Sequence, residues 1–341
     1  MILNAFSVLA VFAALLRVVL GLVVVFVGVR AIRRHRRAAA GTDENRFYLL
    51  VSMSATLLGL VLVSWPLLYL VLQSYVPQWP GVMCIRGVTR IGTGSVGAAS
   101  YLPGLVGFLE VTKPALIFVS GAWLVLHFAN RRDRVGALMG RAFWALLLCG
   151  VWATVDGAAE LAYLIIPKQE ASLAAGCCSV EPALLSVAGP FRPPLPGSAS
   201  VEDHTWLGVA FFSLGAALVV ILSLALRRAA RGGTPWLALA LVGALVSLPL
   251  GVAFLGAVAA PAFLRLPYHQ CGYCLIASAP ESLVGIALYV GGAFGIGWAC
   301  IARWLGTTAA DRSDLSLPLL RVARFGYLAS LLMMTGRLVI S

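Results

Sequence analysis

Cysteines are the residues of this sequence whose type and spacing best suit chemistry. Cys271 and Cys274 form a C-x-x-C motif, and His269 precedes them by two residues. Two sulfurs at this spacing can form a reversible disulfide or bind one metal ion. His269 would act as a nitrogen ligand, or as a cation that lowers a thiol pKa. Attachment of a c-type haem is excluded, because residue 275 is a leucine and not a histidine.

Three further cysteines lie in polar segments between apolar stretches: Cys84, Cys177 and Cys178. The adjacent pair is not expected to bond to itself, because a disulfide between neighbours departs from ordinary disulfide geometry. Adjacent cysteines instead bond two different partners or turn toward one soft metal ion. The other two cysteines of the chain, Cys149 and Cys300, fall inside apolar stretches.

Three interpretations of these thiols stay open. They form structural disulfides that tie loops together, as an oxidising compartment favours. They bind a soft metal, Cu(I) or zinc, with Cys271 and Cys274 as the primary ligands. Alternatively, Cys271 and Cys274 are a catalytic pair that exchanges disulfides with an external protein or, less favoured, with a membrane quinone. The metal interpretation predicts a site formed by Cys84, Cys177, Cys178, His269, Cys271 and Cys274.

Charged residues inside apolar stretches are the second chemical feature. Arg17 interrupts the first stretch, and Asp156 and Glu160 share one helix face in the fourth. A cation in the bilayer interior costs about 2.5–3.5 kcal/mol on insertion scales, so Arg17 should face protein or water. Counted from the outer surface, the depths permit Arg17 to pair with Asp156, with Glu160 on the same helix face, if the first and fourth helices touch. The pair either fixes helix packing or belongs to a proton or ion path that leads to the outer loops.

The elements that position these groups are membrane helices. The 341 residues are 61% hydrophobic and 11% charged, whereas a soluble domain is about 25% charged. We expect an all-α polytopic membrane protein with about eight transmembrane helices, forming a single transmembrane domain over 1–341. The predicted spans are 5–29, 47–73, 114–129, 137–166, 206–226, 235–260, 282–302 and 318–339, each close to the length that crosses a bilayer.

The distribution of basic residues predicts the orientation of the helices. Seventeen of the 25 lysines and arginines fall in or beside the linkers that follow odd-numbered spans: Arg30, Arg33, Arg34, Arg36, Arg37, Arg46, Arg131, Arg132, Arg134, Arg141, Arg227, Arg228, Arg231, Arg303, Arg312, Arg321 and Arg324. The opposite side has Arg86, Arg90, Lys113, Lys168, Arg192, Arg265 and Arg337. Positive residues mark the cytoplasm, so both termini should face outward, to the periplasm. The net charge of +12 is explained by this topology, and no nucleic acid partner is expected.

The same orientation gives three outer loops, at 74–113, 167–205 and 261–281, of which the first two are long. They carry all five of the loop cysteines. Within the first loop, the apolar piece Tyr101–Leu109 is expected to lie in the membrane interface as a short amphipathic or re-entrant helix. Each of the first three helix pairs is followed by a cysteine-bearing outer loop, which suggests a weak internal repeat.

The sequence therefore predicts a multi-pass protein of the bacterial inner membrane that presents a Cys/His cluster to the periplasm. Its expected role is accessory: handling of copper or zinc, or thiol–disulfide redox, for a periplasmic protein. The alternative is a permease, or a structural subunit that assembles with other membrane subunits and whose outer loops are tied by disulfides. The lipid bilayer is the one partner that composition itself requires.

Overall fold

The computed structural model describes residues 4–35, 44–79, 82, 84–93, 95–132, 139–168, 205–228, 234–266, 271–305 and 309–340. In these residues all regular structure is helical, and eight helices are long and apolar enough to cross a membrane. The prediction of an eight-helix, all-α membrane protein is confirmed at this level. Helices dominate because lipid offers no partner for a backbone N–H or C=O group, so each span must satisfy these groups internally.

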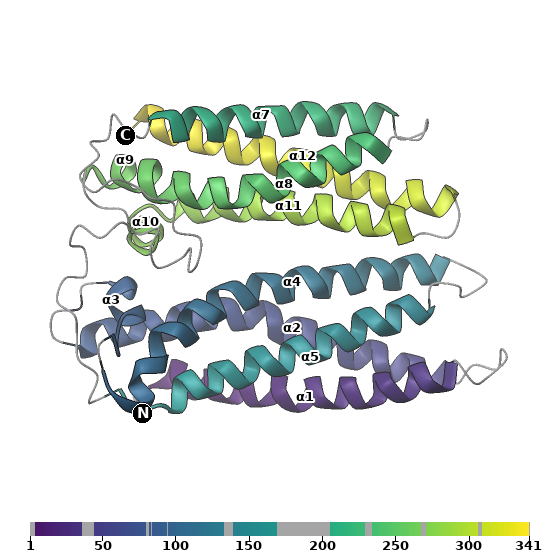
Figure 1. The fold of residues 1–341 in the computed structure, drawn as a ribbon, viewed down its shortest axis with the longest axis horizontal. Helices are drawn as coiled ribbons and strands as arrows, with labels where there is room; N and C mark the ends of the chain where they lie inside the picture. Colours follow the sequence, from purple (N-terminus) through teal and green to yellow (C-terminus); the bar gives the residue numbers. More distant parts are fainter. Residues whose placement is uncertain are drawn as a thin grey trace. The chain divides into compact units, whose positions relative to one another are not determined.

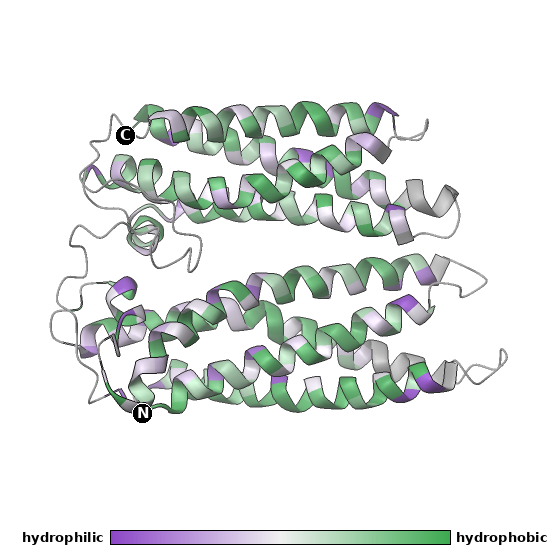
Figure 2. Ribbon diagram, in the orientation of Figure 1, coloured by the Kyte–Doolittle hydropathy of each residue, from purple (hydrophilic) through white to green (hydrophobic). Residues whose placement is uncertain are grey.

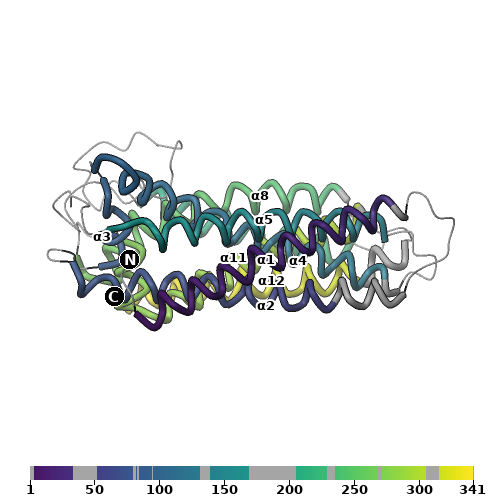
Figure 3. The backbone as a smooth tube through the Cα atoms, turned by 90° about the horizontal axis from the view of Figure 1, so that it is seen from below, coloured from purple at the N-terminus to yellow at the C-terminus, as the bar shows by residue number. Residues whose placement is uncertain are grey.

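The chain divides into two compact units, the first comprising Met1–Cys177. Its long helices are α1 (Ala5–His35), α2 (Glu44–Tyr75), α4 (Leu102–Arg132) and α5 (Met139–Ile165). Between α2 and α4 come the 3₁₀ turn η1 (Val76–Gln78), the short helix α3 (Ile85–Thr89) and the 3₁₀ turn η2 (Gly97–Tyr101). Helix α3 lies at the end of the bundle where α1 begins (Figures 1 and 3).

The second unit comprises Cys178–Ser341. Its long helices are α7 (Thr205–Arg228), α8 (Thr234–Phe254), α11 (Glu281–Leu305) and α12 (Ala309–Ile340). Helix α8 continues through a π-helical turn, η5 (Leu255–Ala259), into α9 (Ala260–Leu264). The short helix α10 (Gly272–Ser278) follows, at the end of this bundle where α7 begins (Figure 1).

Each unit is a four-helix bundle built to the same plan. In the first, α1 packs against α2 and α5, and α4 packs against α5 and α2. In the second, α7 packs against α8 and α12, and α11 packs against α12 and α8. In both, the link between the second and third long helices contains a short helix that begins at a cysteine. The repeating element is therefore a set of four helices, twice the helix pair suggested by the sequence.

Hydrophobic residues cover most of each long helix, and hydrophilic residues gather near the helix ends (Figure 2). Because lipid is as apolar as the helix surface, association within the bundle depends on close contact of small residues. Helices α1 and α5 approach through Gly21, Gly150 and Gly157. A Cβ atom at Gly150 would lie 3.0 Å from the carbonyl oxygen of Gly21, and one at Gly157 would lie 3.0 Å from that of Ala14.

The expectation for Tyr101–Leu109 is wrong. Tyr101 ends η2, and α4 begins at Leu102 and runs without interruption to Arg132, so this piece is not a separate short helix but the first part of a helix that is long and apolar enough to cross a membrane. Lys113, assigned by the sequence to an outer loop, consequently lies inside α4. Glu110, Lys113 and Pro114 lower the local hydropathy and produce the apparent boundary. The helix can continue past Lys113 because this charge is paired inside the bundle.

Candidate functional site

Four charged side chains meet inside the first unit: Arg17 of α1, Lys113 of α4, and Asp156 and Glu160 of α5. All four are at most 1% exposed. The two Nη atoms of Arg17 divide between the carboxylates, Nη1 donating to Asp156 and Nη2 to Glu160. Lys113 Nζ donates to Asp156 Oδ2 at 3.2 Å and to Glu160 Oε2 at 2.6 Å. Each carboxylate therefore contacts both cations, and two positive groups balance two negative ones.

The spacing of the helices explains why this cluster can form. Asp156 and Glu160 are four residues apart and so face the same direction from α5. Because Gly21 and Gly157 let α1 approach α5 closely, the guanidinium of Arg17 can reach both carboxylates at once. A fork-shaped guanidinium is suited to this double contact, whereas a lysine offers a single point of charge.

Neutral polar groups complete the surroundings of the charge cluster. Thr112 Oγ1 donates to Asp156 Oδ1 at 2.9 Å, and Trp152 Nε1 donates to the carbonyl oxygen of Thr112 at 3.2 Å. Ser64 Oγ of α2 lies 3.5 Å from Lys113 Nζ. All four long helices of the unit thus contribute to one polar centre. Trp152 here serves as a hydrogen-bond donor that links α5 to α4.

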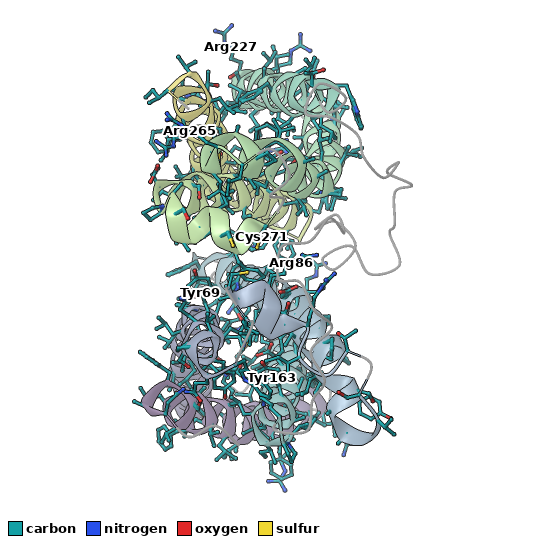
Figure 4. All side chains as sticks on the ribbon, turned by 90° about the vertical axis from the view of Figure 1, so that its left-hand side faces the viewer. Tyr69, Arg86, Tyr163, Arg227, Arg265 and Cys271 are labelled. Atoms are coloured by element: carbon teal, nitrogen blue, oxygen red, sulfur yellow. The ribbon has the colours of Figure 1, made fainter. Side chains whose placement is uncertain are left out.

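The charge cluster leaves two of its own polar atoms without a partner in the described part of the chain: Arg17 Nε and Glu160 Oε1. The hydroxyl of Tyr163, one turn further along α5, is also buried and has no hydrogen-bond partner in this part of the chain. Figure 4 shows Tyr163 among the helices of the first unit. A set of ion pairs whose charges balance can fix helix packing. The unpaired Oε1 atom of Glu160 is the atom that could accept a proton or a hydrogen bond from a small polar group.

Lys168 lies just beyond the end of α5, where its side chain contacts Tyr163. Its side chain is 1% exposed, and Nζ donates to the carbonyl oxygen of Tyr163 at 2.6 Å. The ammonium also lies 4.5 Å from the ring centre of Tyr163 and 5.6 Å from that of Tyr75. Burial disfavours the charged form and lowers the pKa of Lys168 to about 8.

The lowered pKa of Lys168 predicts a pH dependence of stability. Below pH 8 the lysine is protonated in both states, and the folded protein bears the full cost of burying the charge. Above pH 8 the folded form loses its proton while the unfolded form keeps it up to about pH 10.4. The melting temperature of the wild-type protein, relative to that of Lys168→Met in the same detergent, should therefore rise between about pH 8 and 10. A difference that stays constant over this range would contradict the assignment.

The C-x-x-C motif of the second unit forms a dithiol at the start of α10. Its first cysteine, Cys271, is labelled in Figure 4. Cys271 is the residue that precedes the helix, and its carbonyl oxygen accepts a hydrogen bond from Leu275 N at 3.0 Å. The Sγ atoms of Cys271 and Cys274 lie within 4.8 Å of each other. Cys271 is 3% exposed and Cys274 is half-buried. Two metal–sulfur bonds of about 2.3 Å can span such a separation, whereas a disulfide requires the sulfurs to close to about 2.05 Å.

Helix α9, which precedes the dithiol in the sequence, has a well-defined end. Arg265 follows α9 in the left-handed region, with φ of 54°. Arg265 N bonds to the carbonyl oxygen of Ala262 at 3.3 Å, and Leu266 N bonds to that of Pro261 at 3.1 Å. This is the hydrogen-bonding pattern that closes a helix when one residue is left-handed. Helix α9 therefore ends at Leu264, and α10 begins after Cys271.

Cys84 has the equivalent place in the first unit. It precedes α3 in an extended conformation, and its carbonyl oxygen accepts a hydrogen bond from Gly87 N at 3.0 Å. It is half-buried. The structure thus puts Cys84 and the Cys271–Cys274 pair at corresponding positions of two bundles of the same plan.

The remaining predicted ligands, Cys177, Cys178 and His269, lie outside the described residues. Cys149 and Cys300 are buried within α5 and α11. Among the described cysteines, Cys84, Cys149, Cys271, Cys274 and Cys300, none is joined to another by a disulfide. The structural-disulfide interpretation therefore has no bridge in this part of the chain.

Sequence reasoning identified Arg17, Asp156 and Glu160, and the structure brings these three together. It missed Lys113 as a member of the charge cluster. The signal that could have found it is electroneutrality, because one arginine cannot compensate two buried carboxylates. A second intramembrane cation would balance the charge, and Lys113, which directly precedes the predicted span 114–129, is one of the basic residues that border an apolar stretch.

Comparison of the chain with protein-family models, with curated proteins and with solved structures finds no match. The class of the protein is therefore defined by its own features. It is a multi-pass helical membrane protein that contains a buried charge cluster and a dithiol.

Proposed function

We propose that this is a bacterial-type inner-membrane protein that holds a soft metal ion, Cu(I) or zinc, for a periplasmic partner. The observation that carries the proposal is the approach of the Cys271 and Cys274 sulfurs to within 4.8 Å at the start of α10. Thiolates at this separation are suited to one soft ion, because sulfur ligands select Cu(I) and zinc over hard cations. Two thiolates are enough for Cu(I), whereas zinc requires four ligands.

The further ligands of the proposed site are Cys84, Cys177, Cys178 and His269. Support for Cys84 comes from its position at the start of α3, which corresponds to that of Cys271 at the start of α10. Support for the other three comes from the sequence, because the distribution of basic residues assigns their loops to the outer face of the membrane. This arrangement presents the metal outward, where a periplasmic protein could receive or deliver it.

Thiol–disulfide exchange by the same pair is the competing use of the dithiol. Exchange with a protein partner requires an accessible thiolate. Cys271, which stands at the start of the helix, is 3% exposed, and the more accessible sulfur belongs to Cys274 inside the helix. This exposure pattern favours a ligand pair over a nucleophile that attacks an external disulfide.

The metal content of the purified protein tests the proposal. Reduced wild-type protein, titrated with Cu(I) or zinc against a competing chelator, should bind the metal in stoichiometric amount. Removing a residue that merely orients a ligand weakens metal binding by about 10–100-fold. Loss of a ligand itself, in Cys271→Ser or Cys274→Ser, should weaken binding by about a hundredfold or more.

Cys300→Ser is the matched control, because Cys300 is a buried cysteine of the same unit within α11. It should bind metal like the wild type. Unchanged affinity in Cys271→Ser would overturn the proposal. A dithiol that binds no metal and titrates as a disulfide at a potential well above about −300 mV would assign the pair to redox exchange instead.

A second candidate function, that of a permease or a subunit of a larger membrane complex, is favoured by a different observation. The charge cluster of the first unit joins all four of its helices, and one oxygen of Glu160 is left open within it. In that case the charge cluster would carry the function and the dithiol would be secondary. Metal titration distinguishes the two candidates, because only the first requires Cys271 and Cys274.

A further inference from the structure

Three arginines of the second unit converge on a single hollow between α7 and α12. Arg227 belongs to the last turn of α7, and Arg321 and Arg324 lie three residues apart on α12. The hollow has a volume of about 320 Å³ and is completed by Ser223, Leu226 and Leu317. Figure 4 shows Arg227 at the edge of its bundle. All three arginines are exposed, so a ligand can reach them from outside.

The positive charge in this hollow is not compensated by the described side chains. No carboxylate among them forms an ion pair with Arg227, Arg321 or Arg324, and the ion pairs of the described residues lie elsewhere. The next residue along, Arg228, is engaged differently: its guanidinium stacks over the ring of Trp236 at 5.1 Å. Three neighbouring cations repel one another unless an anion lies between them. The planar fork of arginine matches phosphate oxygens in a two-point contact.

The surface that continues from the hollow along α12 is apolar. Phe325, Leu328 and Leu332 follow Arg321 at helical spacing and are 65%, 45% and 64% exposed. This stripe belongs to a helix that is long and apolar enough to span the membrane. We infer that the arginines lie near the level where headgroups meet acyl chains, because Arg227 is in the last turn of its candidate span and Arg321 and Arg324 are in the first turns of theirs. A free phosphate would use the arginines but not the stripe.

We propose that the hollow lined by Arg227, Arg321 and Arg324 binds the phosphate of an anionic phospholipid whose acyl chains lie along Phe325, Leu328 and Leu332. The site is separate from the dithiol and independent of the proposed metal function. Because these arginines belong to the set that the sequence assigns to the cytoplasmic side, the lipid would come from the inner leaflet. The negative surface of that leaflet attracts basic residues near the membrane.

Thermal stability of the full chain in detergent tests the proposal with phosphatidylglycerol as the probe. A ligand that binds the folded state raises the melting temperature according to its concentration and affinity. Phosphatidylglycerol should raise the melting temperature of the wild type. Arg321→Gln/Arg324→Gln should require about a hundredfold more lipid for the same shift, because each charge-assisted contact is worth about tenfold in affinity. Arg228→Gln, the matched control, should respond like the wild type.

Two control ligands identify the source of the phosphate. Phosphatidylcholine, which has the same chains and no net charge, should produce a much smaller shift, and inorganic phosphate alone should produce none at the same concentration. An equal shift from either compound would overturn the lipid assignment, and so would an unaltered response in Arg321→Gln/Arg324→Gln. If that double variant does not fold, Arg227→Gln replaces it, with an expected tenfold loss. An unchanged affinity there overturns the proposal equally.

Discussion

Replacing Arg17 with methionine should destabilise the protein by about 3–5 kcal/mol, the range found when one partner of a buried ion pair is removed. The loss follows from the geometry of the charge cluster. Without the guanidinium, Asp156 and Glu160 keep only Lys113, and one negative charge is left uncompensated at a site that is 0% exposed. The measurement is the unfolding free energy or melting temperature of the protein in detergent. Arg30→Met, on the same helix but outside the charge cluster, should change stability by less than about 1 kcal/mol.

A second change should reverse most of this loss. In Arg17→Met/Glu160→Gln, the remaining Lys113 and Asp156 form a balanced pair, so the double variant should be more stable than Arg17→Met alone. The interaction energy between the two positions should reach about 0.5–3 kcal/mol, as for residues of one hydrogen-bonded network. Simple addition of the two single losses would contradict the view that the charge cluster acts as one unit.

The double variant also distinguishes packing from conduction. If the charge cluster only fixes helix packing, the double variant folds and its dithiol binds metal as in the wild type. A function that depends on a proton at Glu160 would be lost in the same variant, because glutamine cannot ionise. Folding and metal binding of the double variant are thus the controls against which loss of a function at Glu160 is measured.

The spans could be predicted from the sequence because hydropathy alone determines which segments leave water. Seven of the eight predicted spans agree with their helices, with most ends shifted by a few residues. The larger shifts, six residues at the end of α1 and nine at the start of α12, occur where charged residues continue the helix. The failure at Tyr101–Leu109 has one cause. A span that contains Glu110, Lys113 and Pro114 looks like a loop unless the partners of its charges are known.

The members of the charge cluster could be predicted where their depth along a helix could be counted. Arg17 and Asp156 could be paired because counting residues from the helix ends places them at similar depths, and Glu160 shares the helix face of Asp156. Lys113 could not be assigned to the same depth, because the start of its helix had been misplaced. The error in one boundary thus removed one of the four charges.

The dithiol was predictable because its geometry is local. Two cysteines three residues apart are brought together by a single helical turn, whatever the rest of the chain does. The wider ligand set depends on tertiary structure, and Cys177, Cys178 and His269 lie outside the described residues, so their participation stays a prediction. The four-helix repeat was hidden for another reason. Lipid-facing positions require only hydrophobicity, and two copies can therefore diverge in sequence while keeping one plan.

The close contact of α1 and α5 leads to the second large effect, at Gly21. A Cβ atom added there would lie 2.8 Å from the carbonyl oxygen of Gly150, a backbone atom that cannot move independently of its helix. Gly21→Ala should therefore force the two helices apart and destabilise the protein by about 1–3 kcal/mol, the usual cost of overpacking. This loss of stability is opposite in sign to the effect of helix propensity, which favours alanine over glycine by about 1 kcal/mol.

Gly28→Ala is the matched control for this change, because Gly28 lies two turns further along the same helix. Its added Cβ would have one neighbour, Leu147 Cβ, at an ordinary contact distance of 3.9 Å. The control should be neutral or slightly stabilising, so the two alanine variants should differ in the sign of their effect on the melting temperature. Because Arg17 lies one turn from Gly21, separation of the helices also lengthens the contacts of Arg17 with Asp156 and Glu160. Gly21→Ala should consequently destabilise Arg17→Met/Glu160→Gln less than it destabilises the wild type. An equal loss of stability in both proteins would show that the glycine contact and the charge cluster act independently.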